Sequence, residues 1–254
     1  MTDRKTLLLQ RLDEIAGALA ATGDGLALLG LGSVGAELDR LDEYSDLDYF
    51  AIVKQGCKGR FLTNTDWISR PRPVVYWFAN TVDGFKYLYD DGIFCEMAVF
   101  EARELASIPF AAGRIVWRDP AFDPALLAPP PTKHDQRPVE WLLGEALTNL
   151  YVGLGRYHRG EKLSAQRFIQ GYAVDRVLEL APHLAQAEPV PADPFTPERR
   201  FEARYPTLAA HLPRFMQGYD SSLASARAIL AFLDAHFEVN PGMKQAIEKL
   251  SSED

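Results

Sequence analysis

GLGSVGAELDRLDEYSDLDYFAIV, residues 30–53, is the stretch of sequence that decides the fold. It opens with G-x-G-x-x-G, the spacing of a dinucleotide-binding turn, which must lead into a full helix and then a strand with an acid at its end. After Gly35, only about two helical turns fit before the polar turn at Asp42–Ser45. The acids Asp46 and Asp48 stand at the start of the following strand. This context contradicts the dinucleotide-binding interpretation.

The two acids favour a metal and phosphate site instead. Asp46 and Asp48 are two residues apart on a predicted strand, so both carboxylates project from one face, with Cα atoms roughly 7 Å apart. Carboxylate and phosphate oxygens are the ligands that Mg²⁺ prefers. Upstream, Gly32 and Ser33 close one strand and open a short helix, whose free N–H groups can hold a triphosphate together with the Ser33 hydroxyl. Gly32 removes a side chain where the phosphates must approach the backbone.

This arrangement resembles a known family pattern. A Gly32-Ser33 pair, twelve intervening residues and Asp46-x-Asp48 leading into apolar residues are similar to the motif of the polymerase-beta-like nucleotidyltransferase superfamily. The superfamily has a third carboxylate on a later strand, and Glu96 in GIFCEMAVF matches that position, although many relatives have Asp there. The resemblance implies that Asp46, Asp48 and Glu96 are catalytic metal ligands and that Gly32 and Ser33 bind the nucleotide.

The resemblance to the superfamily covers residues 26–100, and its antibiotic branch is similar in layout over the whole chain. In that branch, which includes streptomycin adenylyltransferases and lincosamide nucleotidyltransferases, a hairpin ends in the third acid, a loop like the one around Trp67 precedes it, and a helical second half follows. The resemblance therefore implies an antibiotic-resistance enzyme. It would use Mg²⁺ to transfer a nucleoside monophosphate, expected to be AMP from ATP, to a hydroxyl of a small molecule.

Hydrophobic patterning divides the chain into two parts of different character. Alternating or continuous apolar runs predict six short strands, at residues 26–31, 47–53, 74–79, 85–89, 93–100 and 114–117. Residues 119–138 hold six prolines and are predicted to be a linker, and from Val139 onward the periodicity is helical. The expected fold class is α+β, with a small mixed-sheet nucleotidyltransferase head at 1–118 and an all-helical, acceptor-binding bundle domain at 139–254. The acceptor is expected in a cleft between these two domains.

Composition narrows the partners. The formal net charge is −8, from 27 basic and 35 acidic residues, which disfavours a polyanion such as nucleic acid and suits a small cationic acceptor. No apolar run approaches the roughly 20 residues that span a bilayer. The first residues form an amphipathic helix pattern unlike a signal peptide, so a cytoplasmic protein is expected. The expected partners are an NTP and a small-molecule acceptor, with no nucleic acid and no membrane, in a monomer or a homodimer.

Several alternatives stay open on the sequence. The base that activates the acceptor could be Glu96 or a helical-domain carboxylate such as Glu145; we favour Glu96 because it shares a sheet with the two aspartates. Lys86 could neutralise phosphate charge or be an ordinary surface lysine. The chain could also be a toxin–antitoxin-type nucleotidyltransferase that modifies a protein or RNA, or a non-catalytic nucleotide-binding relative. The first of these is disfavoured because such enzymes are usually shorter and lack a helical domain.

Overall fold

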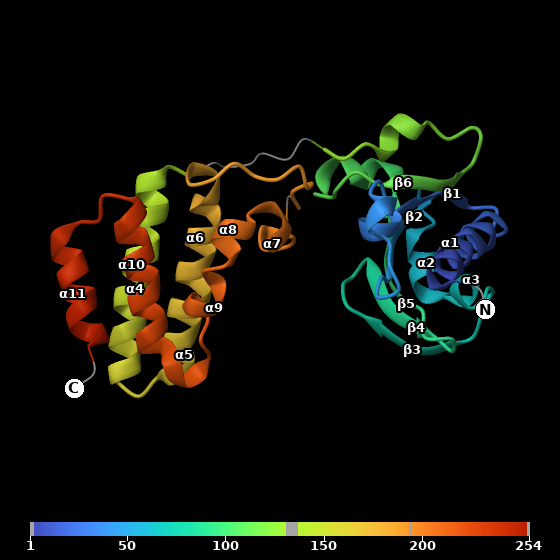
Figure 1. Ribbon diagram of the computed structural model, residues 1–254. Helices are drawn as coiled ribbons and strands as arrows, with labels where there is room; N and C mark the ends of the chain where they lie inside the picture. Colours follow the sequence, from blue (N-terminus) through green and yellow to red (C-terminus); the bar gives the residue numbers. More distant parts are fainter. Residues whose placement is uncertain (1–2, 131–136, 194, 253–254) are drawn as a thin grey trace. The chain divides into compact units, whose positions relative to one another are not determined.

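The computed structural model describes residues 3–130, 137–193 and 195–252, and the chain divides into two compact units, Met1–Thr132 and Lys133–Asp254 (Figure 1). The first unit combines a six-stranded mixed sheet with helices. The second is helical throughout the secondary structure that its described residues form. The predicted α+β class is therefore confirmed.

The first unit begins with a helix and contains all six strands. Its elements are α1 (Arg4–Ala20), β1 (Gly25–Gly30), the 3₁₀ turns η1 (Gly32–Val34) and η2 (Leu38–Arg40), β2 (Leu47–Val53), α2 (Lys58–Thr63), α3 (Asp66–Ser69), β3 (Val74–Ala79), β4 (Gly84–Tyr89), β5 (Phe94–Glu101), η3 (Ala102–Ser107), β6 (Arg114–Arg118) and η4 (Pro124–Leu127). Each predicted strand is present, with its ends within a residue of the predicted ones.

The strands form one sheet in the order β3-β4-β5-β2-β1-β6. Only the central pair, β2 and β5, is parallel; the other neighbouring strands are antiparallel. Parallel neighbours start at the same edge of a sheet. The first residues of β2 and β5 therefore lie side by side, and these are the residues that carry the candidate acids.

One face of the sheet is covered by α1, α2 and α3. The inward stripe of α1 consists of Leu8, Leu12, Ile15 and Leu19, all fully buried at helical spacing. Burial of each such side chain stabilises the fold by roughly 1.5–3 kcal/mol. This face is the principal core of the first unit, and it fixes which residues of each strand point to the opposite face.

The opposite face is covered only in part. Ile52 of β2 and Phe100 of β5 are paired in register and buried with Phe122 and Leu127. The starts of β2 and β5 lie outside this second cluster. Residues 119–130, predicted to be linker, pack on the head here instead, because Phe122 and Leu127 supply apolar side chains between the prolines. Residues 131–136 of the predicted linker lie outside the described residues.

The segment 54–72, predicted to be a loop around Trp67, contains the two short helices α2 and α3. Both are too short to show a helical period in the sequence. They are held by burial of Phe61, Trp67 and Ile68 against α1 and the sheet. Tertiary packing, and not local propensity, therefore determines this segment.

The second unit contains one long helix with shorter ones packed around it. Its elements are α4 (Val139–His158), α5 (Lys162–Arg167), the π-helical turn η5 (Phe168–Ala173), α6 (Val174–Leu180), η6 (Ala181–His183), α7 (Phe201–Arg204), α8 (Pro206–Ala209), α9 (Leu212–Phe215), η7 (Tyr219–Ser221), α10 (Ser222–His236) and α11 (Pro241–Ser251). Residues 206–215 form the two single turns α8 and α9 and not one continuous helix, because Pro213 interrupts it. Among the described residues, no helix is long and apolar enough to cross a bilayer.

Candidate active site

The register of the central strands places two candidate acids next to each other. Asp48 of β2 is the direct partner of Glu96 of β5. Residues paired across two strands point to the same face. The next pair, Tyr49 and Met97, is buried in the core on the opposite face, while Asp48 and Glu96 are only half-buried. Both acids therefore lie on the partly open face of the sheet.

Asp46 immediately precedes β2 and is also half-exposed. Its charge reaches the same neighbourhood, as the pKa of Lys86 shows. That pKa is raised first by the hydrogen bond from Lys86 to Glu96 and by the charge of Glu96, and more weakly by the charges of Asp48 and Asp46. All three predicted acids thus lie within electrostatic reach of one lysine.

Gly32 packs against the carboxylate of Asp48. Its φ angle is 53°, in the left-handed region that favours glycine. A Cβ atom at this position would lie 2.7 Å from Oδ2 of Asp48, which is closer than atoms can approach. The amide of Leu31 donates a hydrogen bond of 2.7 Å to the Asp48 carbonyl and fixes the turn in place. The backbone angle therefore favours glycine, and any larger residue would displace the Asp48 carboxylate.

Ser33 follows in η1, and here the structure differs from expectation. The short helix predicted after Gly35 is replaced by the two separate 3₁₀ turns η1 and η2. A single 3₁₀ turn has no appreciable helix dipole, so the charge that a full helix would offer to a phosphate is missing. What remains is local: Ser33 is half-exposed, and neither its hydroxyl nor the N–H groups of Gly32 and Ser33 hydrogen-bond to any described residue.

Glu96 is already engaged by neighbouring side chains. Lys86 of β4 forms an ion pair of 2.8 Å with Oε2 of Glu96, with 37% and 42% of the two side chains exposed. Asn80 Nδ2 donates to Oε1 at 3.4 Å. Within the described part of the chain, no group of three or more His, Cys, Asp and Glu side chains is close enough together to hold a metal ion. Asp48 and Glu96 share a face of the sheet, and the Glu96 carboxylate is paired with Lys86.

The pairing of Lys86 with Glu96 was missed from the sequence, although a signal for it exists. The turn Asp90-Asp-Gly92 was predicted to join two strands of a hairpin. In a hairpin, residues equally distant from the centre of the turn are partners. Lys86 and Glu96 are each five residues from Asp91 and are indeed paired in register.

The other residues singled out from the sequence lie in the second unit. Glu145 of α4 is half-exposed, and its main-chain carbonyl accepts a hydrogen bond from Asn149. On α6, burial raises the pKa of Asp175, partly offset by the charge of Arg176. The structure therefore shows Glu145 on an ordinary, partly solvated helix face.

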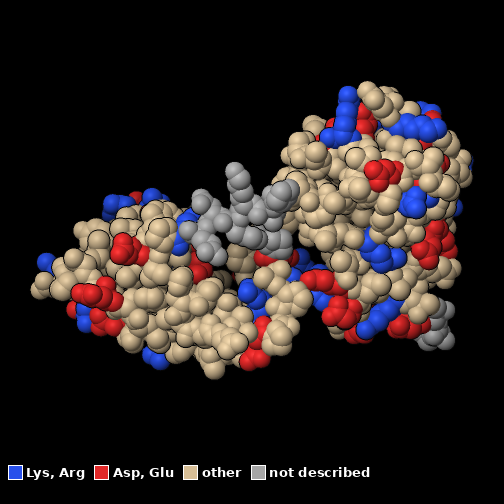
Figure 2. All heavy atoms as spheres, turned by 90° about the horizontal axis from the view of Figure 1, so that it is seen from above, with Lys and Arg blue, Asp and Glu red and all other residues tan. Residues whose placement is uncertain are grey.

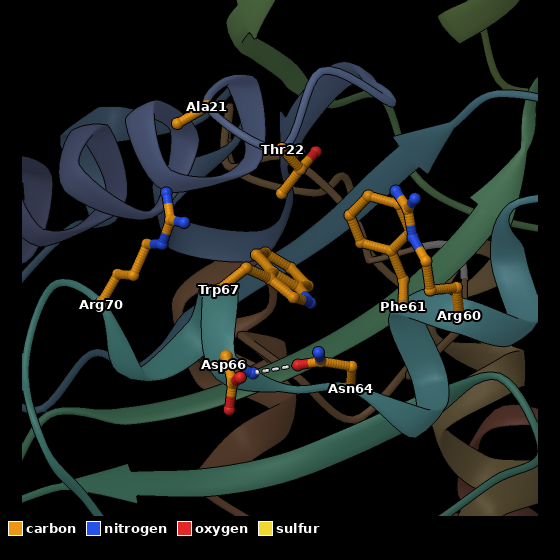
Figure 3. Close-up of a pocket in the computed structure, with 8 residues that line it drawn as sticks. All are labelled: Ala21, Thr22, Arg60, Phe61, Asn64, Asp66, Trp67 and Arg70. Atoms are coloured by element: carbon orange, nitrogen blue, oxygen red, sulfur yellow. Dashed lines mark hydrogen bonds between the residues drawn. The ribbon is translucent and has the colours of Figure 1, made fainter.

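A separate cavity of about 380 Å³ lies on the helix-covered face of the sheet (Figure 3). Its lining residues come from the end of α1 and from α2 and α3: Ala21, Thr22, Arg60, Phe61, Asn64, Asp66, Trp67 and Arg70. None of the candidate acids contributes to it. Surface charge does not mark a site on the face shown in Figure 2, because basic and acidic side chains are interspersed on each unit.

Comparisons with known proteins give one remote structural likeness. No protein-family model matches the chain, and no curated protein matches it. Among solved structures, an aminoglycoside 6-adenyltransferase from Bacillus subtilis is similar, with 14% sequence identity, coverage of 95% of this chain and 90% of that chain, and a TM-score of 0.34. A likeness this remote does not establish a shared activity.

Proposed function

We propose that this protein is a nucleotidyltransferase that moves a nucleoside monophosphate, AMP from ATP, to a hydroxyl of a small molecule. The observation that supports this most strongly is the arrangement around Asp48. Its strand partner is Glu96, and the backbone of Gly32 packs against its carboxylate. Acids on one sheet face beside a side-chain-free turn suit a site where a charged, bulky triphosphate approaches the backbone.

The residues present fit a divalent cation in their chemistry. Asp48 at the start of β2 and Asp46 immediately before that strand offer carboxylate oxygens, the type of ligand that Mg²⁺ prefers, and they would hold it. Mg²⁺ bound there would neutralise the triphosphate and activate the acceptor oxygen. The N–H groups at Gly32 and Ser33, with the Ser33 hydroxyl, would orient the phosphates, since none of them is committed to another described residue.

Glu96 would accept the proton of the acceptor hydroxyl. Lys86 holds the Glu96 carboxylate at 2.8 Å and would release it when the nucleotide and the cation bind. The acceptor class that we propose is a small cationic molecule such as an aminoglycoside or a lincosamide. The net charge of −8 is consistent with this choice, because it attracts cations over long range.

The ion pair between Lys86 and Glu96 also favours a second candidate function, a non-catalytic nucleotide-binding protein. If the lysine keeps Glu96 occupied, the chain can bind a nucleotide without transferring it. A toxin–antitoxin-type transferase acting on a protein or RNA would share the same chemistry and differ in its acceptor.

One experiment separates these functions. The full chain is incubated with each of the four α-³²P-labelled NTPs and Mg²⁺, with and without a panel of aminoglycosides and lincosamides. We expect label on a small-molecule acceptor and stoichiometric pyrophosphate, with ATP preferred and with EDTA abolishing both. Nucleotide binding without pyrophosphate release would support the non-catalytic alternative. Label on added RNA or protein, with none on the small molecules, would contradict the proposed acceptor class.

A further inference from the structure

Two large aromatic side chains on the edge strand β3 face solvent. Tyr76 is 55% exposed and Phe78 is 52% exposed. Neither contributes to a hydrophobic cluster among the described residues. Exposing two neighbouring rings costs free energy that burial would recover, so such a pair marks a surface that binds something.

The strand register connects these rings to the candidate acids. Phe78 is the partner of Lys86, Lys86 is the partner of Glu96, and Glu96 is the partner of Asp48. In the neighbouring row, Tyr76 pairs with Leu88, which pairs with Phe94. Partners across a sheet share a face. Tyr76 and Phe78 therefore lie on the same face as the acids, with Phe78 about 14 Å from Asp48 across three strand spacings.

The residue between the two rings behaves differently. Trp77 pairs with Tyr87 and points to the opposite face, where its ring packs edge-on against Phe85 at 5.5 Å. Tyr76 and Phe78 are therefore the exposed rings of β3 that share a face with the acids, whereas the exposed ring of Trp77 lies on the other face. Trp77, which is 59% exposed on the same strand, provides a matched control.

The order of the strands places the proposed phosphate site and the aromatic residues on opposite sides of Asp48. Gly32, where the phosphates are proposed to bind, follows β1 and lies on one side of Asp48. Glu96, Lys86 and Phe78 follow one another on the other side. If the nucleotide binds at Gly32, the surface over β5, β4 and β3 remains available to the acceptor, whose hydroxyl would meet Glu96. That molecule therefore reaches Phe78 and Tyr76.

From this we infer that Tyr76 and Phe78 form a platform on which a ring of the acceptor stacks. The inference rests on the proposed function and narrows its acceptor to a cyclic, hydroxyl-bearing cation, such as an aminated sugar or cyclitol. A saturated ring presents C–H groups to an aromatic face, and a cationic substituent is attracted to the same face. The length of the row, about 14 Å at one strand spacing per step, accommodates a molecule of two or three rings.

The test compares Phe78→Ala and Tyr76→Ala with Trp77→Ala in the full chain. Streptomycin and lincomycin are the acceptor probes, and ATP turnover is followed by pyrophosphate release. Loss of one stacked ring should raise the acceptor KM by about tenfold, with the KM for ATP and kcat within about twofold of wild type. Trp77→Ala should leave the acceptor KM unchanged. Thermal melts of all three variants identify any loss that comes from unfolding.

Calorimetric titration of the two probes without nucleotide measures acceptor binding independently of turnover, so the platform is tested separately from the reaction. Weaker probe binding by Phe78→Ala supports the platform even if wild type releases no pyrophosphate, a result that would contradict only the proposed function. Unchanged probe affinity and acceptor KM in both aromatic variants would overturn the platform. A rise confined to the KM for ATP would show that the surface binds the nucleobase. A wild-type dimer that Phe78→Ala converts to monomer would show that the surface binds a second copy of the chain. Either result would overturn the inference.

Discussion

Gly32 and Asp48 show how a single residue pair defines the candidate site. Glycine is favoured there twice, by a φ of 53° and by an Asp48 oxygen only 2.7 Å from the place of a Cβ, which a side chain would displace. Many turn glycines satisfy only the first condition. Gly56, with a φ of 79°, has nothing within 4 Å of an added Cβ.

This difference predicts that two alanine variants lose similar stability but differ in activity. Gly32→Ala and Gly56→Ala should each lose about 1–2 kcal/mol of unfolding free energy for the left-handed backbone. Only Gly32→Ala should also lose nucleotidyl transfer, by at least about tenfold, because its methyl group displaces the Asp48 carboxylate. Urea unfolding and pyrophosphate release measure the two effects. Equal activity of the two variants would show that Gly32 has no role beyond its backbone angle.

At this scale, the sequence supplied the candidates but not their contacts. Gly32, Asp46, Asp48 and Glu96 were chosen for residue type and spacing, and the strand register places Asp48 and Glu96 on one face. The ion pair that engages Glu96 depends on the alignment of β4 with β5, which follows from counting outward from the turn at Asp91 and not from residue type and spacing around the acids.

At the scale of elements, the strands were predictable and their neighbours were not. Each of the six strands has an apolar run bounded by turn residues, so its limits follow from the chain itself. The parallel contact of β2 with β5 joins segments more than forty residues apart and depends on long-range packing. The helices α2 and α3 were missed for the same reason, because tertiary contacts such as the burial of Phe61 and Trp67 hold them.

A buried pair of tyrosines offers a test of how β2 and the hairpin strand β4 are joined. The hydroxyls of Tyr49 and Tyr87 lie 2.5 Å apart, and both side chains are 1% exposed. Either single change to Phe removes this buried hydrogen bond and should cost about 1–3 kcal/mol. The double variant should cost less than the sum of the two. Urea unfolding of all four proteins measures the coupling, and strictly additive losses would contradict a bonded pair.

The same two tyrosines should make the free energy of unfolding fall at alkaline pH. Burial raises the pKa of Tyr49 and of Tyr87 well above the ordinary value. The unfolded chain therefore loses these protons at lower pH than the folded one, so stability is full below about pH 10 and falls as the pH rises above it. The double Phe variant should lose less stability than wild type over that range.

At the scale of the whole molecule, the chain is two units with separate cores. The sheet unit buries its residues against α1 and under η3 and η4. The helical unit packs α4 against α5, η5, α6, α10 and α11. The change from strand to helical periodicity near Val139 predicted this change of character. The proline content did not locate the end of the first unit, because Phe122 and Leu127 are part of its core.

Which unit supplies the acceptor's base is a question at this scale. If Glu96 is the base, Glu96→Gln should lower kcat by about 10²–10⁴-fold at every pH, and Glu145→Gln should change the acceptor KM at most. A large kcat loss confined to Glu145→Gln, with nucleotide affinity untouched, would move the base to the helical unit. Steady-state kinetics and nucleotide titrations of both variants decide between them.

The central claim is that the acids at the start of β2 and β5 carry out nucleotidyl transfer, and Asp48→Asn tests it most directly. The change removes a charge and keeps the shape of the side chain. Asp66→Asn, an exposed carboxylate of the same unit, is the matched control. The account predicts that Asp48→Asn abolishes Mg²⁺-dependent pyrophosphate release and weakens Mg·ATP binding at nearly unchanged melting temperature, while Asp66→Asn matches wild type. Retention of more than about a tenth of the wild-type kcat, a barrier change under ~1.4 kcal/mol, would contradict it.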